Sequence, residues 1–128
     1  GGHLRSCVGG PSVQESKNRW GQFWVDWLRR DILDFVVVMN YATDIESFSS
    51  ILWTISNEVT FEEQKKIYIG INTIDNYLNM HKLREIDIIK QQVRNSIDFD
   101  YIGLSIFSYE YFDLDKKLYL KILKIIYL

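Results

Sequence analysis

At or just beyond the carboxyl end of each of the longer strands predicted in this chain lie side chains that could bind a polar ligand or move a proton. These candidate site residues are Asn40, Tyr41, Asp44, Asn72, Ser108, Tyr109 and Glu110. In parallel α/β folds, ligands bind and chemistry takes place at the carboxyl ends of the strands. The two carboxylates, Asp44 and Glu110, are the candidates for acid–base chemistry, whereas the amide, hydroxyl and phenol groups are suited to hydrogen bonding with a ligand.

The elements that would position these residues alternate between strands and helices. An unbroken apolar run at residues 35–39, with three consecutive valines, predicts a strand at 33–41 that is buried on both faces. Other strands are predicted at 4–8, 67–72 and 101–109, and helices at 20–28, 45–58, 75–97 and from about 113 onward. This order predicts right-handed βαβ units in a parallel sheet. Four such units make half of a (β/α)8 barrel, and a small open doubly wound sheet fits the same pattern.

Composition narrows the classes of function. The net charge of −2 gives no broad electrostatic attraction to nucleic acid. Cys7 is the only cysteine, and His3 and His81 are the only histidines, so a zinc site or a Ser-His-Asp triad is poorly supported. No glycine-rich phosphate loop follows a strand, and we expect no cofactor and no metal. No apolar run reaches the roughly 18 residues of a membrane span.

Several short motifs, in order, resemble a known family. They are Gly21-Gln22-Phe23-Trp24 with Trp27-Leu28, then Asp34-Phe35-Val36 with Met39-Asn40-Tyr41, then residues 67–72, and finally Ile102-Gly103 with Phe107-Ser108-Tyr109. The pattern resembles the glycosyl-hydrolase-like barrels of the family-ten-like type, which are bacterial proteins and often exported or lipid-anchored. Asn72 departs from the family, which has a second glycine at that position.

The resemblance implies that residues 1–128 form a single partial domain, strands five to eight of a (β/α)8 barrel. The first four strands would lie upstream, as the opening Gly1-Gly2 without an initiator methionine also suggests. Family members carry an L-D-Y-I-R-Y-P-like element near strand four, with a candidate catalytic aspartate, and nothing like it occurs here. The resemblance also implies an exported or cell-envelope location, although this chain shows no signal peptide.

By the same resemblance, the expected activity is binding or hydrolysis of bacterial cell-wall polysaccharide. Glycoside hydrolysis generally needs two carboxyl groups, here Asp44 and Glu110 as catalytic candidates. The other five candidate site residues would bind substrate. With the upstream acid missing, we expect the chain alone to hydrolyse nothing.

Other interpretations stay open. Asp44 is also a plausible helix N-cap, and Glu110 could be a solvated loop charge. The tryptophans of the 20–28 helix are more typical of a core than of a sugar-stacking platform. The chain could also be a non-catalytic half-barrel that binds glycans or forms a homodimer through its unpaired edge strands.

Overall fold

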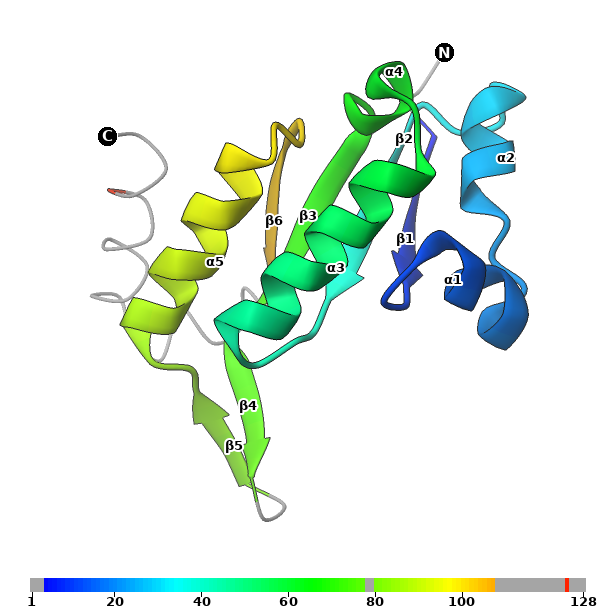
Figure 1. Cartoon of the computed structure of the whole chain (residues 1–128). Helices are drawn as coiled ribbons and strands as arrows, with labels where there is room; N and C mark the ends of the chain where they lie inside the picture. The colour runs from blue at the N-terminus through cyan, green and yellow to red at the C-terminus, as the bar shows by residue number, and fades with distance from the viewer. Residues whose placement is uncertain (1–3, 78–79, 108–123, 125–128) are drawn as a thin grey trace.

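The computed structural model describes residues 4–77, 80–107 and 124 of the chain. Their fold is a four-stranded, all-parallel sheet with helices between the strands (Figure 1). The sheet is formed by β1 (Arg5–Gly9), β2 (Phe35–Asn40), β3 (Ile67–Asn72) and β6 (Gly103–Phe107), which lie side by side in that order. A doubly wound sheet reverses its strand order at one point, and these four strands have no such reversal.

Short and long helices connect the strands. The first connection holds α1 (Val13–Trp20) and α2 (Trp24–Arg29), and the second holds α3 (Ile45–Glu58) and α4 (Phe61–Gln64). The third holds a two-stranded antiparallel hairpin, β4 (Ile74–Tyr77) and β5 (Met80–Leu83), followed by α5 (Ile86–Asp98). Figure 1 shows α3 and α5 side by side across one face of the sheet, with the hairpin projecting from the end where the strands finish.

The main core lies between the sheet and these helices. Its largest side chains that are almost fully buried include Trp24 and Leu28 of α2, Phe48, Leu52 and Ile55 of α3, and Ile67, Ile69 and Ile71 of β3. Val36 to Asn40 are all at most 8% exposed, so β2 is buried on both faces, as its unbroken apolar run predicts.

On the sheet face opposite α3 and α5, larger side chains lie over two glycines. A Cβ atom at Gly70 would come within 2.6 Å of Met39 Sδ, 3.2 Å of a Phe107 ring carbon and 3.3 Å of a Val37 methyl carbon. A Cβ at Gly103 would come within 2.8 Å of the Tyr68 ring. Glycine is therefore required at both positions for these larger neighbours to pack as they do.

Two predicted helices differ from the structure. The predicted helix at 20–28 is confirmed for residues 24–28, which lie in α2, but not for residues 20–23, because α1 ends at Trp20 with Gly21 as its left-handed C-cap, at φ 63° and ψ 25°. Trp20 and Trp24 therefore lie on separate helices, and Trp20 is 50% exposed whereas Trp24 is 1% exposed. The predicted helix at 75–97 begins only at Ile86, because β4 and β5 occupy residues 74–83. The helix predicted from about 113 lies outside the described residues.

Candidate functional site

Pockets gather at the carboxyl end of the sheet, around Tyr41. This residue follows β2 directly and is 57% exposed. It lines three separate pockets, with volumes of about 490, 340 and 200 Å³. The sequence predicts ligand binding at this end of the sheet, and the pockets make Tyr41 the centre of the candidate site.

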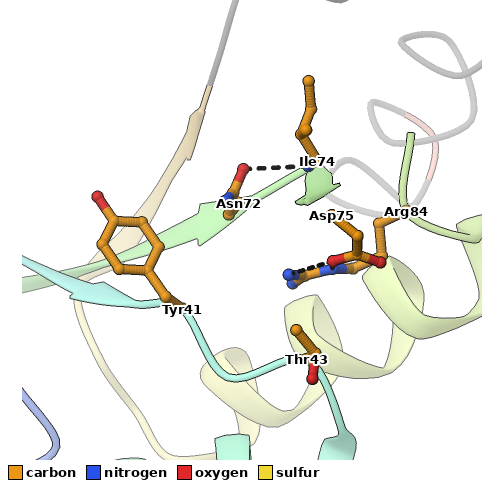
Figure 2. A pocket seen from close by; sticks show the side chains of 6 residues that line it. All are labelled: Tyr41, Thr43, Asn72, Ile74, Asp75 and Arg84. Carbon is orange, nitrogen blue, oxygen red and sulfur yellow. Dashed lines mark hydrogen bonds and ion pairs between the residues drawn. The ribbon is translucent and has the colours of Figure 1, made fainter. Parts of the chain in front are cut away.

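The largest of these, here called the polar pocket, lies between the β2–α3 loop and the hairpin. It is lined by Tyr41, Thr43, Asn72, Ile74, Asp75 and Arg84. Figure 2 shows the Arg84 guanidinium reaching toward the middle of this group, with the Asp75 carboxylate beside it. Residues that carry phenol, hydroxyl, amide, carboxylate and guanidinium groups thus line one space, and such groups can both donate and accept hydrogen bonds.

Arg84 is a buried charge with several partners. Its side chain is 1% exposed, Nε donates to Asp75 Oδ1 at 2.9 Å, and Nη2 forms an ion pair with the same oxygen at 2.8 Å. Its Nη1 donates to Gln92 Oε1 at 3.0 Å. Gln92 is fully buried in α5, and its Nε2 donates to the Ala42 carbonyl oxygen at 2.9 Å. Burial of a guanidinium is tolerated only with such pairing. The network of bonds joins the hairpin, α5 and the β2–α3 loop.

The turn from β3 into the hairpin is held by its own polar groups. Asn72 Oδ1 accepts from the Ile74 backbone N–H at 3.0 Å, as the second dashed line of Figure 2 shows. Thr73 donates to the Phe107 carbonyl oxygen through both its backbone N–H, at 2.8 Å, and its hydroxyl, at 2.7 Å. The buried Thr73 therefore fixes the direction in which the chain leaves the sheet, and this direction places Asp75 at the polar pocket.

The two smaller pockets share Trp20, Met39 and Tyr41, and we call the space around these three residues the aromatic groove. Trp20 reaches it because Gly10 lacks a side chain: a Cβ there would lie 2.8 Å from the Trp20 ring, and Gly10 has φ 111°. Gln22 Oε1 accepts from the Gly9 backbone N–H at 3.0 Å and holds the end of α1 against β1. The groove therefore presents two half-exposed aromatic rings, those of Trp20 and Tyr41.

Two of the predicted site residues have structural roles. Asn40 is 1% exposed, and its side chain donates to the Phe48 carbonyl oxygen at 3.1 Å and accepts from the Ala42 backbone N–H at 3.3 Å. Asp44 is the N-cap of α3, with Oδ1 accepting from the Ser47 N–H at 2.8 Å, which confirms the predicted cap. Hydrogen bonds from the Ser47 backbone and side chain lower the pKa of the exposed Asp44 carboxyl group.

The remaining predicted residues divide between the polar pocket and the undescribed part of the chain. Tyr41 and Asn72 line the polar pocket together. Ser108, Tyr109 and Glu110 lie outside the described residues. Asp44 is not among the residues that line any of the three pockets.

Sequence reasoning missed four residues of this region: Trp20, Thr43, Asp75 and Arg84. The helical spacing of Trp20 assigned it to the core, although Gly21 directly after it is a usual helix-ending signal. Asp75 and Arg84 were placed inside a predicted helix, so their pairing across the base of a hairpin was not foreseen. In the ranges 4–77 and 80–107, no group of three or more His, Cys, Asp or Glu residues is arranged to hold a metal ion.

Comparisons with known proteins add no identification. No protein-family model matches the chain, and neither the curated proteins nor the solved structures contain a match. None of the helices in the described part of the chain is long and apolar enough to cross a membrane.

Proposed function

We propose that this chain binds carbohydrate, of the bacterial cell-wall glycan class, at the carboxyl end of its parallel sheet. The observation that carries the proposal is the aromatic groove, where Trp20 is 50% exposed and Tyr41 is 57% exposed. Large aromatic side chains are usually much more buried than this in a folded domain. An exposed aromatic ring offers an apolar face on which a pyranose ring can stack.

The polar pocket complements the groove chemically. Tyr41 lines both, so a chain of sugar units could lie on the aromatic rings at one end and meet hydrogen-bonding groups at the other. Sugar hydroxyls donate and accept hydrogen bonds, and the pocket offers both kinds of partner in the Asn72 amide and the Asp75 carboxylate. This combination of stacking surface and dense polar groups favours an oligosaccharide over a small apolar ligand.

The proposal also concerns the fold, which we interpret as half of a barrel. Parallel strands that follow one another in chain order, each reached through a helix-containing connection, are consistent with strands five to eight of a glycosyl-hydrolase-like (β/α)8 barrel. In such a barrel, the polar pocket and the groove would lie at the catalytic mouth. Hydrolysis would need a second carboxyl group, from Glu110 or from upstream strands, so we expect the chain alone to bind glycans without cleaving them.

Isothermal titration calorimetry with chito-oligosaccharides tests the binding proposal. We expect saturable binding that is weakened about fivefold or more in Trp20→Ala, since stacking on an aromatic ring is worth on the order of 1 kcal/mol or more. Trp53→Ala is the matched control, because Trp53 is 61% exposed on α3 and lines none of the three pockets. Absence of binding to every oligosaccharide tried, or equal losses in both variants, would contradict the proposal.

Self-association is the second candidate function, and the sheet edges favour it. In the described residues, β1 pairs only with β2 and β6 pairs only with β3, so each presents one unpaired side. Unpaired strands invite another chain, and two copies could close an eight-stranded assembly with two-fold symmetry. Light scattering at increasing protein concentration tests this, and a monomer at all concentrations would refute it.

A further inference from the structure

We propose that Asp75 occupies the position at Arg84 that a ligand carboxylate would otherwise take, so that the polar pocket accepts neutral sugars and rejects acidic ones. The inference rests on the proposed function for the identity of the ligand as a sugar. Its physical core, the blocking of Arg84 by an internal carboxylate, stands on the geometry of the pocket alone.

The guanidinium of Arg84 is the natural anion receptor of this pocket. Arginine binds carboxylates through a planar fork of N–H groups, often with two parallel hydrogen bonds. Here Nε donates to Asp75 Oδ1, Nη2 is ion-paired with the same oxygen at 2.8 Å, and Nη1 donates to Gln92. The guanidinium is therefore already neutralised and largely saturated with partners from the chain.

The two members of the pair differ in their access to solvent. The Arg84 side chain is 1% exposed, whereas the Asp75 side chain is 34% exposed. Both line the pocket, so a ligand approaching Arg84 meets the carboxylate of Asp75 as well. A second carboxylate would meet this like charge at short range and would find the charge of the guanidinium already neutralised.

Asp75 at the same time gives a neutral sugar a strong hydrogen-bond acceptor. A carboxylate can accept about four hydrogen bonds, and the contacts with Arg84 use only Oδ1. Its other oxygen, Oδ2, can accept from sugar hydroxyls, and such charge-assisted bonds are stronger than neutral ones. The remaining lining residues Tyr41, Thr43, Asn72 and Ile74 carry no formal charge at neutral pH. Asp75 thus acts as the residue that sets specificity, and Arg84 positions it.

The test compares one neutral and one acidic trisaccharide, chitotriose and trigalacturonate, by calorimetry on the whole chain. The wild-type protein should bind chitotriose and give no detectable binding of trigalacturonate. In Asp75→Asn, the guanidinium loses its charged partner and the pocket gains one positive charge. We expect trigalacturonate binding to appear and chitotriose binding to weaken about tenfold, the change typical of losing a charge-assisted bond.

Two further variants test whether a gain of trigalacturonate binding comes from Arg84. Asp98→Asn removes one negative charge from an exposed position at the end of α5, so it controls for net charge and should leave both affinities unchanged. The double variant Asp75→Asn with Arg84→Gln removes the guanidinium, and the binding of trigalacturonate should be lost again. A gain in the double variant equal to that in the single variant would overturn the assignment to Arg84.

The outcomes for this inference and for the proposed function are separate. Failure of the wild-type protein to bind chitotriose counts against the proposed function, whereas a folded Asp75→Asn variant that gains no trigalacturonate binding overturns this inference. Circular dichroism establishes whether the variant is folded. If the Asp75→Asn variant is unfolded, the test uses the wild-type protein alone. Detectable binding of trigalacturonate to the wild-type protein then overturns the inference, and the absence of such binding upholds it.

Discussion

Arg29 donates two parallel hydrogen bonds to Glu63, from Nε to Oε2 at 2.7 Å and from Nη2 to Oε1 at 3.1 Å, and so ties α2 to α4. Glu63 is only 7% exposed, and its Oε1 also accepts from the Thr60 backbone N–H at 2.8 Å, as part of a capping box. Burial raises the pKa of Glu63, but the hydrogen bonds from Arg29 and Thr60 outweigh it and hold the pKa below its ordinary value. This buried carboxylate therefore stabilises the fold in its charged form.

The Glu63 carboxylate should make stability depend on pH. Its pKa is lower in the folded chain than the ordinary 4.5, so acid favours the unfolded state, which binds the proton more readily. At neutral pH, Glu63→Gln should lower the free energy of unfolding by about 1–2 kcal/mol. This loss is smaller than for a fully buried ion pair, because the Arg29 side chain is half exposed and solvent screens its charge. Urea unfolding at a series of pH values should show this difference above the unfolded pKa and its loss as the pH falls through the folded pKa.

The neighbouring Glu62 provides the control for this measurement. Its side chain is 82% exposed, and its nearest cation, Lys65, is 3.9 Å away. Glu62→Gln should leave the free energy of unfolding nearly unchanged at every pH. Equal effects of the two substitutions would show that Glu63 contributes only through net charge.

Gly103 should not tolerate a side chain, because the Tyr68 ring lies where its Cβ would be. The two residues face one another across β3 and β6, and the ring is also 5.1 Å from that of Phe35, centroid to centroid. Gly103→Ala should destabilise the chain by about 1–3 kcal/mol, the usual cost of overpacking. Gly9→Ala is the control, since a Cβ at Gly9 meets nothing within 4 Å.

A double variant distinguishes overpacking from a backbone effect at Gly103. In a Tyr68→Ala background the ring is gone, so the added cost of Gly103→Ala should nearly vanish. Thermal or urea unfolding of the four proteins gives this coupling energy directly. An undiminished cost in the Tyr68→Ala background would mean that the backbone of β6, and not the ring, requires the glycine.

The regular elements could be predicted well from sequence because their signals are local. Residues 67–72 and 45–58 form a strand and a helix with the predicted bounds. The strand is a short apolar run, and the helix repeats apolar residues at helical spacing after Asp44, a good N-cap. These patterns lead to the parallel sheet, and hence to the carboxyl end of the strands as the place for a site.

The hairpin and the Arg84 network could not be predicted in the same way. Residues 74–85 contain no glycine or proline, the residues that usually mark a hairpin turn, and apolar residues beyond 85 have clear helical spacing. The pairing of Arg84 with Asp75 depends on the hairpin, and its contact with Gln92 depends on where α5 packs. The sequence thus identifies Tyr41 and Asn72 as site candidates, but not the charged pair beside them.

Gln92 should be needed to hold Arg84 at the polar pocket. It is completely buried and bonds both Arg84 Nη1 and the Ala42 carbonyl oxygen. Gln92→Leu keeps most of the volume but removes a partner from each of these buried groups and leaves only the longer bond, at 3.4 Å, from Arg84 Nη1 to the Ala42 carbonyl oxygen. The free energy of unfolding should therefore fall by about 2 kcal/mol. Gln91→Leu is the control, because Gln91 is exposed on the same helix. Urea unfolding checks both variants, and equal small losses would show that water replaces the Gln92 amide.

Asp44 offers a test that separates its cap from the catalytic role suggested by family resemblance. Asparagine is as good an N-cap as aspartate, whereas alanine accepts no hydrogen bond from the Ser47 N–H. Asp44→Ala should therefore lower the melting temperature, and Asp44→Asn should leave it nearly unchanged. Because Asp44 lines none of the three pockets, Asp44→Asn should also bind chito-oligosaccharides with wild-type affinity. Calorimetry on the two variants checks this. A marked loss of affinity in Asp44→Asn would show that the Asp44 carboxylate takes part in binding the sugar.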